Sequence, residues 1–263
     1  GMIAVAIVGV FAAFAEETAP GSTQFGAQRD IISINGQSGF IIHPTKPATD
    51  GSKPWVWYAP TFIDQHPDES HAWMAKQLLD AGFAICGVEV GESYGSPAGR
   101  KTYSLFHDYV TSKIGLDERA CLLPQSRGGL MLLSWASDNP TKVQCIAGIY
   151  TVCNIESYPG IAKAAAAYDV DASEFVKRLK DHNPIERTAP LARAKIPILF
   201  VHGDSDTVVP LESNSGIFVE RCIAAGGNAS VIVVRGKGHE VCPEFFQNRQ
   251  FTDFLIARGK PSR

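Results

Sequence analysis

The sequence has no surplus of basic residues, no run of like charges and no long apolar stretch. Its 24 Lys and Arg residues stand against 27 Asp and Glu residues, which gives a net charge of −3 at pH 7. A chain with this balance lacks the basic surface that attracts nucleic acid or anionic lipid. We therefore expect no nucleic-acid partner. No uncharged apolar run reaches the length of about 20 residues that a stable membrane span requires.

Cysteine is present, but not in the spacing that binds metals. None of the six cysteines belongs to a C-x-x-C pair, so the sequence predicts no metal site. Cys86, Cys121 and Cys145 lie in apolar, strand-like runs, where a thiol acts as a small hydrophobic group. The disulfide pairing of an exported form stays open.

The first residues resemble a secretory signal. Residues 3–15 form an uncharged apolar run that ends in Ala13-Phe14-Ala15, although the usual basic start is missing. We expect residues 1–27 to be a signal-like segment with a polar lead-in, and the mature protein to be periplasmic or secreted. The alternative is that the run belongs to the folded domain of a cytoplasmic protein. The rest, residues 28–263, has the size and composition of a single domain.

Short apolar runs alternate with helical segments along this domain. Segments 30–35 and 39–43 flank a Gly-containing turn and predict an antiparallel hairpin. Further strands are predicted at 54–58, 83–90, 120–124, 143–150, 196–201 and 230–234, and helices at 70–81, 102–114, 129–136, 213–225 and 245–257. This alternation implies parallel β-α-β units and a three-layer α/β fold, with the hairpin at one edge of the sheet. Residues 154–190 break the rhythm with helices at 161–168 and 172–180, and predict a small cap.

Ser126 stands where a predicted strand turns directly into a helix, in the string Pro124-Gln-Ser-Arg-Gly-Gly129. A serine on such a tight turn presents its hydroxyl beyond the end of the sheet, and the glycines let backbone and substrate approach it. The pattern predicts a nucleophile elbow. The alternative is a turn serine without a reactive role.

A serine nucleophile needs a base and an orienting carboxylate. Asp206 lies in a turn that follows the strand 196–201, and His239 follows the last strand. Because the carboxyl ends of parallel strands meet at one edge of a sheet, we expect Ser126, Asp206 and His239 to converge. Asp204 is better placed to hold its own turn through bonds to the backbone.

These segments together resemble the α/β-hydrolase superfamily over residues 30–257. The strings are Pro-Gln-Ser126-Arg-Gly-Gly, Gly203-Asp-Ser-Asp206-Thr-Val-Val-Pro and Gly238-His239, in the superfamily's serine, acid, histidine order. Segments 91–97, 126–131 and 183–187 are most similar to exported bacterial esterase-like hydrolases related to the prolyl-oligopeptidase and acetyl-xylan-esterase branches. The resemblance implies a serine hydrolase that cleaves carboxylic esters, including esterified carbohydrates, through an acyl-enzyme on Ser126. This chemistry requires no cofactor.

Two backbone N–H groups are expected to stabilise the oxyanion. The elbow geometry points to the N–H of Arg127, the residue after the nucleophile. The second donor should come from the loop after the strand 54–58. Pro60 has no N–H to donate, so Thr61 and Phe62 are the candidates.

Glu92 and Tyr94 lie on a loop beyond a strand end and are the candidates for binding substrate. The alternative is that Glu92 and Arg127 are structural ion-pair residues and that Tyr94 only packs. Two other functions remain open at this stage. One is a small prolyl-oligopeptidase-like peptidase, and the other is a non-catalytic binding protein on the same fold.

Overall fold

Strands that are apolar on both sides form the centre of the molecule. The structure is a computed structural model that describes residues 17–260, so the expected signal run 3–15 lies outside the described residues. In the described part, nine strands form one sheet in the order β1-β2-β3-β5-β4-β6-β7-β8-β9. The central strands β4 (Trp55–Ala59), β5 (Ala84–Val88), β6 (Ala120–Pro124) and β7 (Val143–Ile149) are buried at every position. Such burial is typical of parallel strands that are covered on both faces.

The sheet is parallel from β5 to its far edge, where β8 (Pro197–Gly203) pairs with β9 (Asn228–Val234). At the other edge, β2 (Ala27–Ile34) and β3 (Gln37–Ile42) form the expected antiparallel hairpin. The polar segment that we expected to be a lead-in instead supplies β1 (Glu17–Gln24), which is antiparallel to β2. Its backbone hydrogen bonds need only the open edge of β2, not an apolar pattern of its own.

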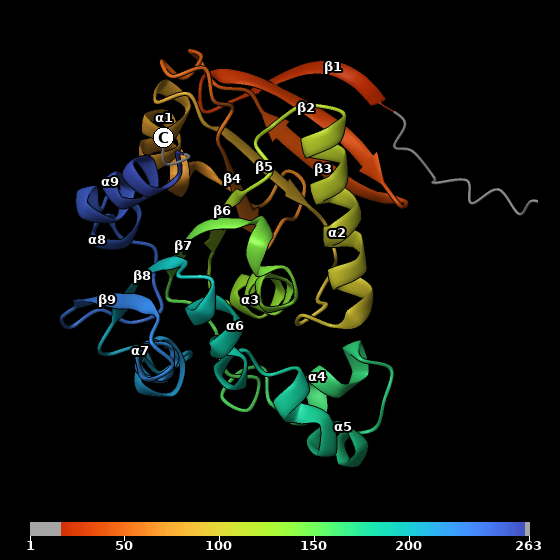
Figure 1. The fold of residues 1–263 in the computed structure, drawn as a ribbon, viewed down its shortest axis with the longest axis vertical. Helices are drawn as coiled ribbons and strands as arrows, with labels where there is room; N and C mark the ends of the chain where they lie inside the picture. Colours follow the sequence, from red (N-terminus) through yellow and green to blue (C-terminus); the bar gives the residue numbers. More distant parts are fainter. Residues whose placement is uncertain (1–16, 261–263) are drawn as a thin grey trace, which may run out of the picture.

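Helices cover both faces of the sheet and complete the three expected layers (Figure 1). On one face, α1 (Ala72–Asp80), α8 (Pro243–Phe246) and α9 (Arg249–Arg258) pack against a cluster that includes Leu78 and Phe251. On the other face lie α2 (Pro97–Ser112), α3 (Gly128–Asp138), α6 (Thr188–Arg193) and α7 (Ile217–Ala224), around Phe106 and Phe218. Among residues 17–260, no helix combines the length and the apolar character that crossing a membrane requires.

The predicted cap is present. Its helices α4 (Ile161–Ala167) and α5 (Ala172–Arg178) project from the layered body at one end (Figure 1). Ala164 and Phe175 of the cap pack with Leu130 and Val152 in a separate apolar cluster. The short helical turns are η1 (Glu69–His71), η2 (Pro140–Lys142), η3 (Leu179–Asp181), η4 (Pro184–Glu186) and the π-helical η5 (Glu212–Gly216).

Helix α2 begins earlier than the apolar pattern predicts. Its first residue is Pro97, and the Ser96 hydroxyl accepts the N–H of Gly99 at 3.5 Å. Serine is favoured just before a helix and proline within its first turn, because the first N–H groups have no partner inside the helix. The loop between β5 and α2 is therefore shorter than expected.

Candidate active site

Ser126 occupies a sharp turn between β6 and α3. Its φ is +49°, in the left-handed region, which costs an L-residue about 1–2 kcal/mol. Two hydrogen bonds hold it there: the Ser126 N–H donates to the Ile149 carbonyl (3.0 Å), and its carbonyl accepts from the Val152 N–H (2.9 Å). The turn places the hydroxyl beyond the end of the strand, as the elbow pattern predicts.

Both glycines after Ser126 are required by close backbone contacts. A Cβ at Gly128 would lie 2.1 Å from the Ala59 carbonyl oxygen, and one at Gly129 would lie 2.2 Å from that of Val152. Any larger residue at these two positions would overlap with a backbone oxygen, and the backbone would have to move to relieve the overlap. The elbow is therefore pressed against the loop that follows β4.

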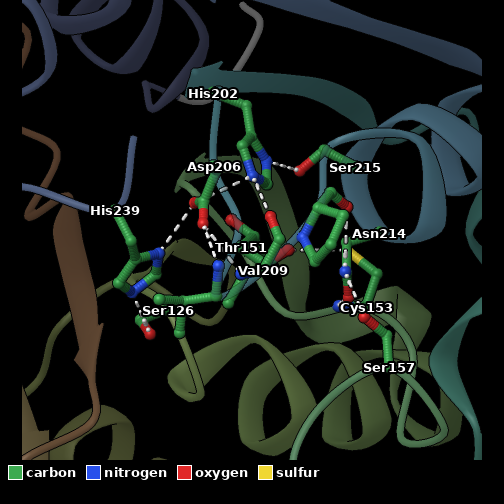
Figure 2. A network of polar contacts seen from close by, with 12 residues as sticks. Ser126, Thr151, Cys153, Ser157, His202, Asp206, Val209, Asn214, Ser215 and His239 are labelled. Atoms are coloured by element: carbon green, nitrogen blue, oxygen red, sulfur yellow. Dashed lines mark hydrogen bonds and ion pairs between the residues drawn. The ribbon is translucent and has the colours of Figure 1, made fainter. Parts of the chain in front are cut away.

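The structure brings Ser126, His239 and Asp206 together (Figure 2). The Ser126 Oγ lies 2.9 Å from the His239 Nε2, and the His239 Nδ1 lies 2.8 Å from the Asp206 Oδ2. The three side chains come from loops beyond the carboxyl ends of β6, β9 and β8. A hydroxyl, an imidazole and a carboxylate in this sequence of contacts can activate the serine for attack.

Asp206 is almost completely buried and is held on both oxygens. Its Oδ1 accepts the N–H groups of Val208 (3.0 Å) and Val209 (2.8 Å), and its Oδ2 faces His239. Burial alone would raise the pKa of Asp206, but hydrogen bonds from His202, Val209 and His239 outweigh it and lower this pKa to about 2. The carboxylate is therefore ionised at neutral pH.

His202 is a site residue that the sequence analysis missed. Its Nε2 donates to the Val209 carbonyl (2.8 Å) and lies 3.4 Å from the Asp206 Oδ2, and its Nδ1 lies 2.8 Å from the Ser215 Oγ (Figure 2). A carbonyl oxygen only accepts, so the Nε2 carries the hydrogen. His202 thus supports Asp206 from the side opposite His239. The available signal was its position four residues before Asp206, near the end of the strand that leads into the turn.

The loops that carry Asp206 and His239 are joined directly. The Asp204 Oδ1 accepts the Gly236 N–H (2.7 Å), and the Ser205 N–H donates to the Lys237 carbonyl (3.0 Å). A Cβ at Gly203 would lie 2.0 Å from the Lys237 carbonyl oxygen. This close contact aligns the carboxylate with the imidazole.

Of the three candidate oxyanion donors, Phe62 is already occupied. Its N–H donates to the His66 carbonyl at 3.2 Å, within the turn 62–66. The prediction that Phe62 is an oxyanion donor was therefore wrong, because its N–H already has a partner. The N–H groups of Thr61 and Arg127 make no hydrogen bond among the described residues. Thr61 is 2% exposed and lies on the loop that Gly128 contacts, so it belongs to the immediate surroundings of the elbow.

Glu92 and Tyr94 have different surroundings. Both Glu92 carboxylate oxygens accept from the Arg127 Nε (2.8 and 2.9 Å), and the Arg127 guanidinium lies 5.2 Å from the centre of the Phe62 ring. Glu92 also borders a cavity of about 310 Å³ that has polar and apolar walls, together with Gln37 and Thr102. Tyr94 is only 4% exposed and packs beneath the cap. Its geometry matches the packing alternative, and Glu92 is both an ion-pair partner and a cavity residue.

A second, more apolar groove lies beside the histidine loop. It has a volume of about 560 Å³ and runs between α1 and the segment that follows His239, with Trp73, Val241 and Phe246 in its lining. This groove and the cavity beside Glu92 are separate, because they share no lining residue.

The nine-stranded sheet, its helical layers and the serine on the elbow define the protein as an α/β-hydrolase. A model of the prolyl oligopeptidase family (Peptidase_S9) matches residues 107–256, which is more than half of the chain. The chain belongs to this family, and it is a serine hydrolase. No curated protein matches it.

Solved structures with the same fold include both esterases and peptidases. An S-formylglutathione hydrolase from Agrobacterium tumefaciens is 16% identical with a TM-score of 0.64, and the match covers 93% of this chain and 99% of that one. A cold-adapted esterase from an Arctic intertidal metagenomic library is 13% identical with a TM-score of 0.65, over 93% and 100% of the two chains. A puromycin-hydrolyzing peptidase from Mycobacterium tuberculosis is 14% identical with a TM-score of 0.69, over 89% of this chain but 39% of that peptidase.

Proposed function

We propose that the protein is a serine esterase that cleaves carboxylic esters through an acyl-enzyme on Ser126. The observation that carries this proposal is the 2.9 Å contact between the Ser126 Oγ and the His239 Nε2. The contact is made by a serine in the left-handed conformation, whose backbone is stabilised on both sides. Strain of this kind is maintained where it serves function, and here it directs a hydroxyl at a base.

In the proposed first step, the His239 Nε2 takes the proton of Ser126 while the Oγ attacks the ester carbonyl carbon. The ionised Asp206 keeps the hydrogen of the imidazole on Nδ1 and stabilises the imidazolium that forms. His239 then gives the proton to the departing alcohol oxygen, and the acyl group stays on Ser126. In the second half of the reaction, His239 deprotonates a water molecule whose oxygen attacks the acyl carbon. The bond from this carbon to the Ser126 Oγ then breaks, His239 returns the proton to the Oγ, and the acid leaves.

The negative charge on the tetrahedral oxygen needs donors that no protein group already uses. The N–H groups of Arg127 and Thr61 meet this condition, and the loops that carry them touch through Gly128. Loss of one such donor typically lowers kcat by about 10²- to 10³-fold. We therefore assign the oxyanion hole to these two groups.

One observation points to the kind of ester. Glu92, the ion-pair partner of Arg127 next to the nucleophile, borders a cavity whose polar residues include Gln37 and Thr102, and these suit an alcohol that carries several hydroxyl groups, such as a sugar. Acetylated saccharides are accordingly the proposed substrate class.

The test compares p-nitrophenyl acetate and acetylated xylan with an aminoacyl p-nitroanilide, for the wild type and for Ser126→Ala. We expect ester turnover by the wild type and none by the variant, and little amide turnover by either. Ester hydrolysis that survives in Ser126→Ala would remove Ser126 from the mechanism.

The family model itself favours a second candidate, a peptidase, because it is that of the prolyl oligopeptidase family. Amide turnover that exceeds ester turnover in the same assays would establish this alternative. A serine-reactive fluorophosphonate probe separates both enzymes from a non-catalytic binding protein, since only an activated Ser126 is labelled.

A further inference from the structure

A buried group of polar side chains lies behind the elbow and is not used in the mechanism above. Its centre is Gln125, the residue before Ser126, and its other members are Tyr58, His71 and Tyr150. We call these four residues the Gln125 cluster. All are 9% exposed or less. Tyr58 lies in β4, His71 lies in η1, and Gln125 and Tyr150 directly follow β6 and β7.

The Gln125 carboxamide joins the other three members. Its oxygen accepts from the Tyr58 hydroxyl (2.7 Å) and lies 2.8 Å from the His71 Nε2, and its nitrogen donates to the Tyr150 hydroxyl (2.8 Å). Burial raises the pKa of both tyrosines, so their hydroxyls keep their protons. The Gln125 oxygen only accepts, so the His71 Nε2 donates its hydrogen to it. With its oxygen held by Tyr58 and His71, the Gln125 carboxamide directs its N–H at the Tyr150 hydroxyl, and both of these groups are uncharged.

Tyr150 connects this cluster to His239. The two rings are 4.3 Å apart between centroids, with their planes inclined at 51°. The hydrogen bonds of His239 to Ser126 and Asp206 fix its two nitrogens, but they leave the ring free to tilt about the line through those atoms. A ring packed against the imidazole limits that tilt.

We infer that Gln125 is a positioning residue: by holding the Tyr150 hydroxyl, it fixes the ring that keeps His239 aligned with Ser126. The backbone of Gln125 contributes to the same alignment, because its N–H donates to the Ala59 carbonyl at 2.8 Å next to the elbow. One residue thus orients both the nucleophile and its base. This inference rests on the proposed function, in which His239 transfers the proton.

The experiment measures kcat and KM for p-nitrophenyl acetate in Gln125→Met, Tyr150→Phe and the double variant. Gln125→Met keeps the length of the side chain but has no hydrogen-bonding amide, and Tyr150→Phe removes a single oxygen atom. Each kcat is divided by the number of active sites that a fluorophosphonate titrates at its end point, which counts folded enzyme only. The matched control is Tyr103→Phe, which also removes the hydroxyl of a buried tyrosine. The Tyr103 hydroxyl bonds only to the Met131 sulfur (3.7 Å), and both residues lie on the other face of the sheet.

Each single variant should lose about 10- to 100-fold in kcat, as expected for a small misplacement of reacting groups, with KM almost unchanged. The double variant should lose no more than the worse single variant, because both act through the same contact. Tyr103→Phe should stay within about twofold of the wild type. If Gln125→Met does not fold, the kcat of Tyr150→Phe alone tests the inference.

A kcat per titrated site that is unchanged in Tyr150→Phe would overturn the inference, as would losses that multiply in the double variant. Failure of the proposed function looks different, because the wild type would then not hydrolyse the ester or Ser126→Ala would still do so.

Discussion

Asp206→Asn changes one atom of a side chain, and the surroundings determine how the new amide is oriented. The N–H groups of Val208 and Val209 both donate to Oδ1 (3.0 and 2.8 Å), so they hold the amide oxygen of an asparagine in that place. The NH₂ group then takes the position of Oδ2, 2.8 Å from the His239 Nδ1, and donates to it. An imidazole that accepts at Nδ1 carries its hydrogen on Nε2, where it cannot receive the proton of Ser126.

This reversal of the tautomer sets the size of the effect. The same change in serine triads lowers kcat by about 10⁴, which corresponds to about 5 kcal/mol of barrier. The new NH₂ group also faces the His202 Nε2, a second donor, at the 3.4 Å separation seen for Oδ2. Two opposed donors in a buried site cost about 1–3 kcal/mol of stability. We therefore expect an enzyme that is almost inactive and moderately destabilised.

The assay is kcat on p-nitrophenyl acetate, with thermal unfolding of the same samples. Asp204→Asn is the matched control, because an amide oxygen at that position can still accept the Gly236 N–H that Asp204 accepts at 2.7 Å. The control should retain wild-type kcat within about twofold. If Asp206→Asn kept more than about a tenth of the wild-type kcat, both the tautomer argument and the role of Asp206 would be refuted.

Three further predictions concern stability and thiol reactivity. The pKa of Asp206 is about 2 in the folded protein against 3.8 for an ordinary aspartate, which stabilises the fold by about 2 kcal/mol. Because the folded value is the lower one, this contribution is present above about pH 4 and is lost as the pH falls towards 2. Asp30 and Asp68 also have lowered pKa values and titrate in both proteins, so urea unfolding across this range should show a loss that is about 2 kcal/mol smaller in Asp206→Asn than in the wild type. Gly128→Ala should lower the free energy of unfolding by about 1–3 kcal/mol or more, since its Cβ would meet the Ala59 carbonyl oxygen at 2.1 Å, and an unchanged melting temperature would contradict that contact. Five of the six cysteines are buried and Cys242 is partly exposed, so a thiol reagent should modify only Cys242 in the native protein and all six after denaturation; fewer than six would reveal a disulfide.

The layered fold and the convergence at its edge could be predicted from local patterns. Strands such as 120–124 and 196–201 are short apolar runs bounded by turn residues, and the helices between them force parallel pairing. Once the strands are parallel, residues just beyond their carboxyl ends share one edge. This is why the sequence predicts that Ser126, Asp206 and His239 meet, although they are spread over more than a hundred residues. In the structure, His239 lies within hydrogen-bonding distance of both Ser126 and Asp206.

Features that depend on the path of a loop or on an open edge could not be predicted. The segment 17–24 contains Pro20 and Gly21 and has no alternating apolar pattern, yet it forms β1 along the edge of β2. The N–H of Phe62 looked available because the sequence does not show that residues 62 and 66 pair with each other. In both cases the deciding partner is a backbone group, which every residue carries and which no side-chain pattern marks.

The residues that support the site, Gln125 and His202, are difficult to predict for a different reason, because they act through side-chain hydrogen bonds. Gln125 and His202 both lie in buried segments, and a buried polar group must find hydrogen-bond partners. The sequence could therefore indicate that each one is bonded, but not to which group, because the partners of Gln125 are 25 to 67 residues away. The two residues restrain different parts of one relay, Gln125 through the Tyr150 ring against His239 and His202 through the Asp206 carboxylate. Loss of either support should thus lower kcat more than KM, because both act on the alignment of His239 with Ser126 and neither lines the groove beside Val241 or the cavity beside Glu92.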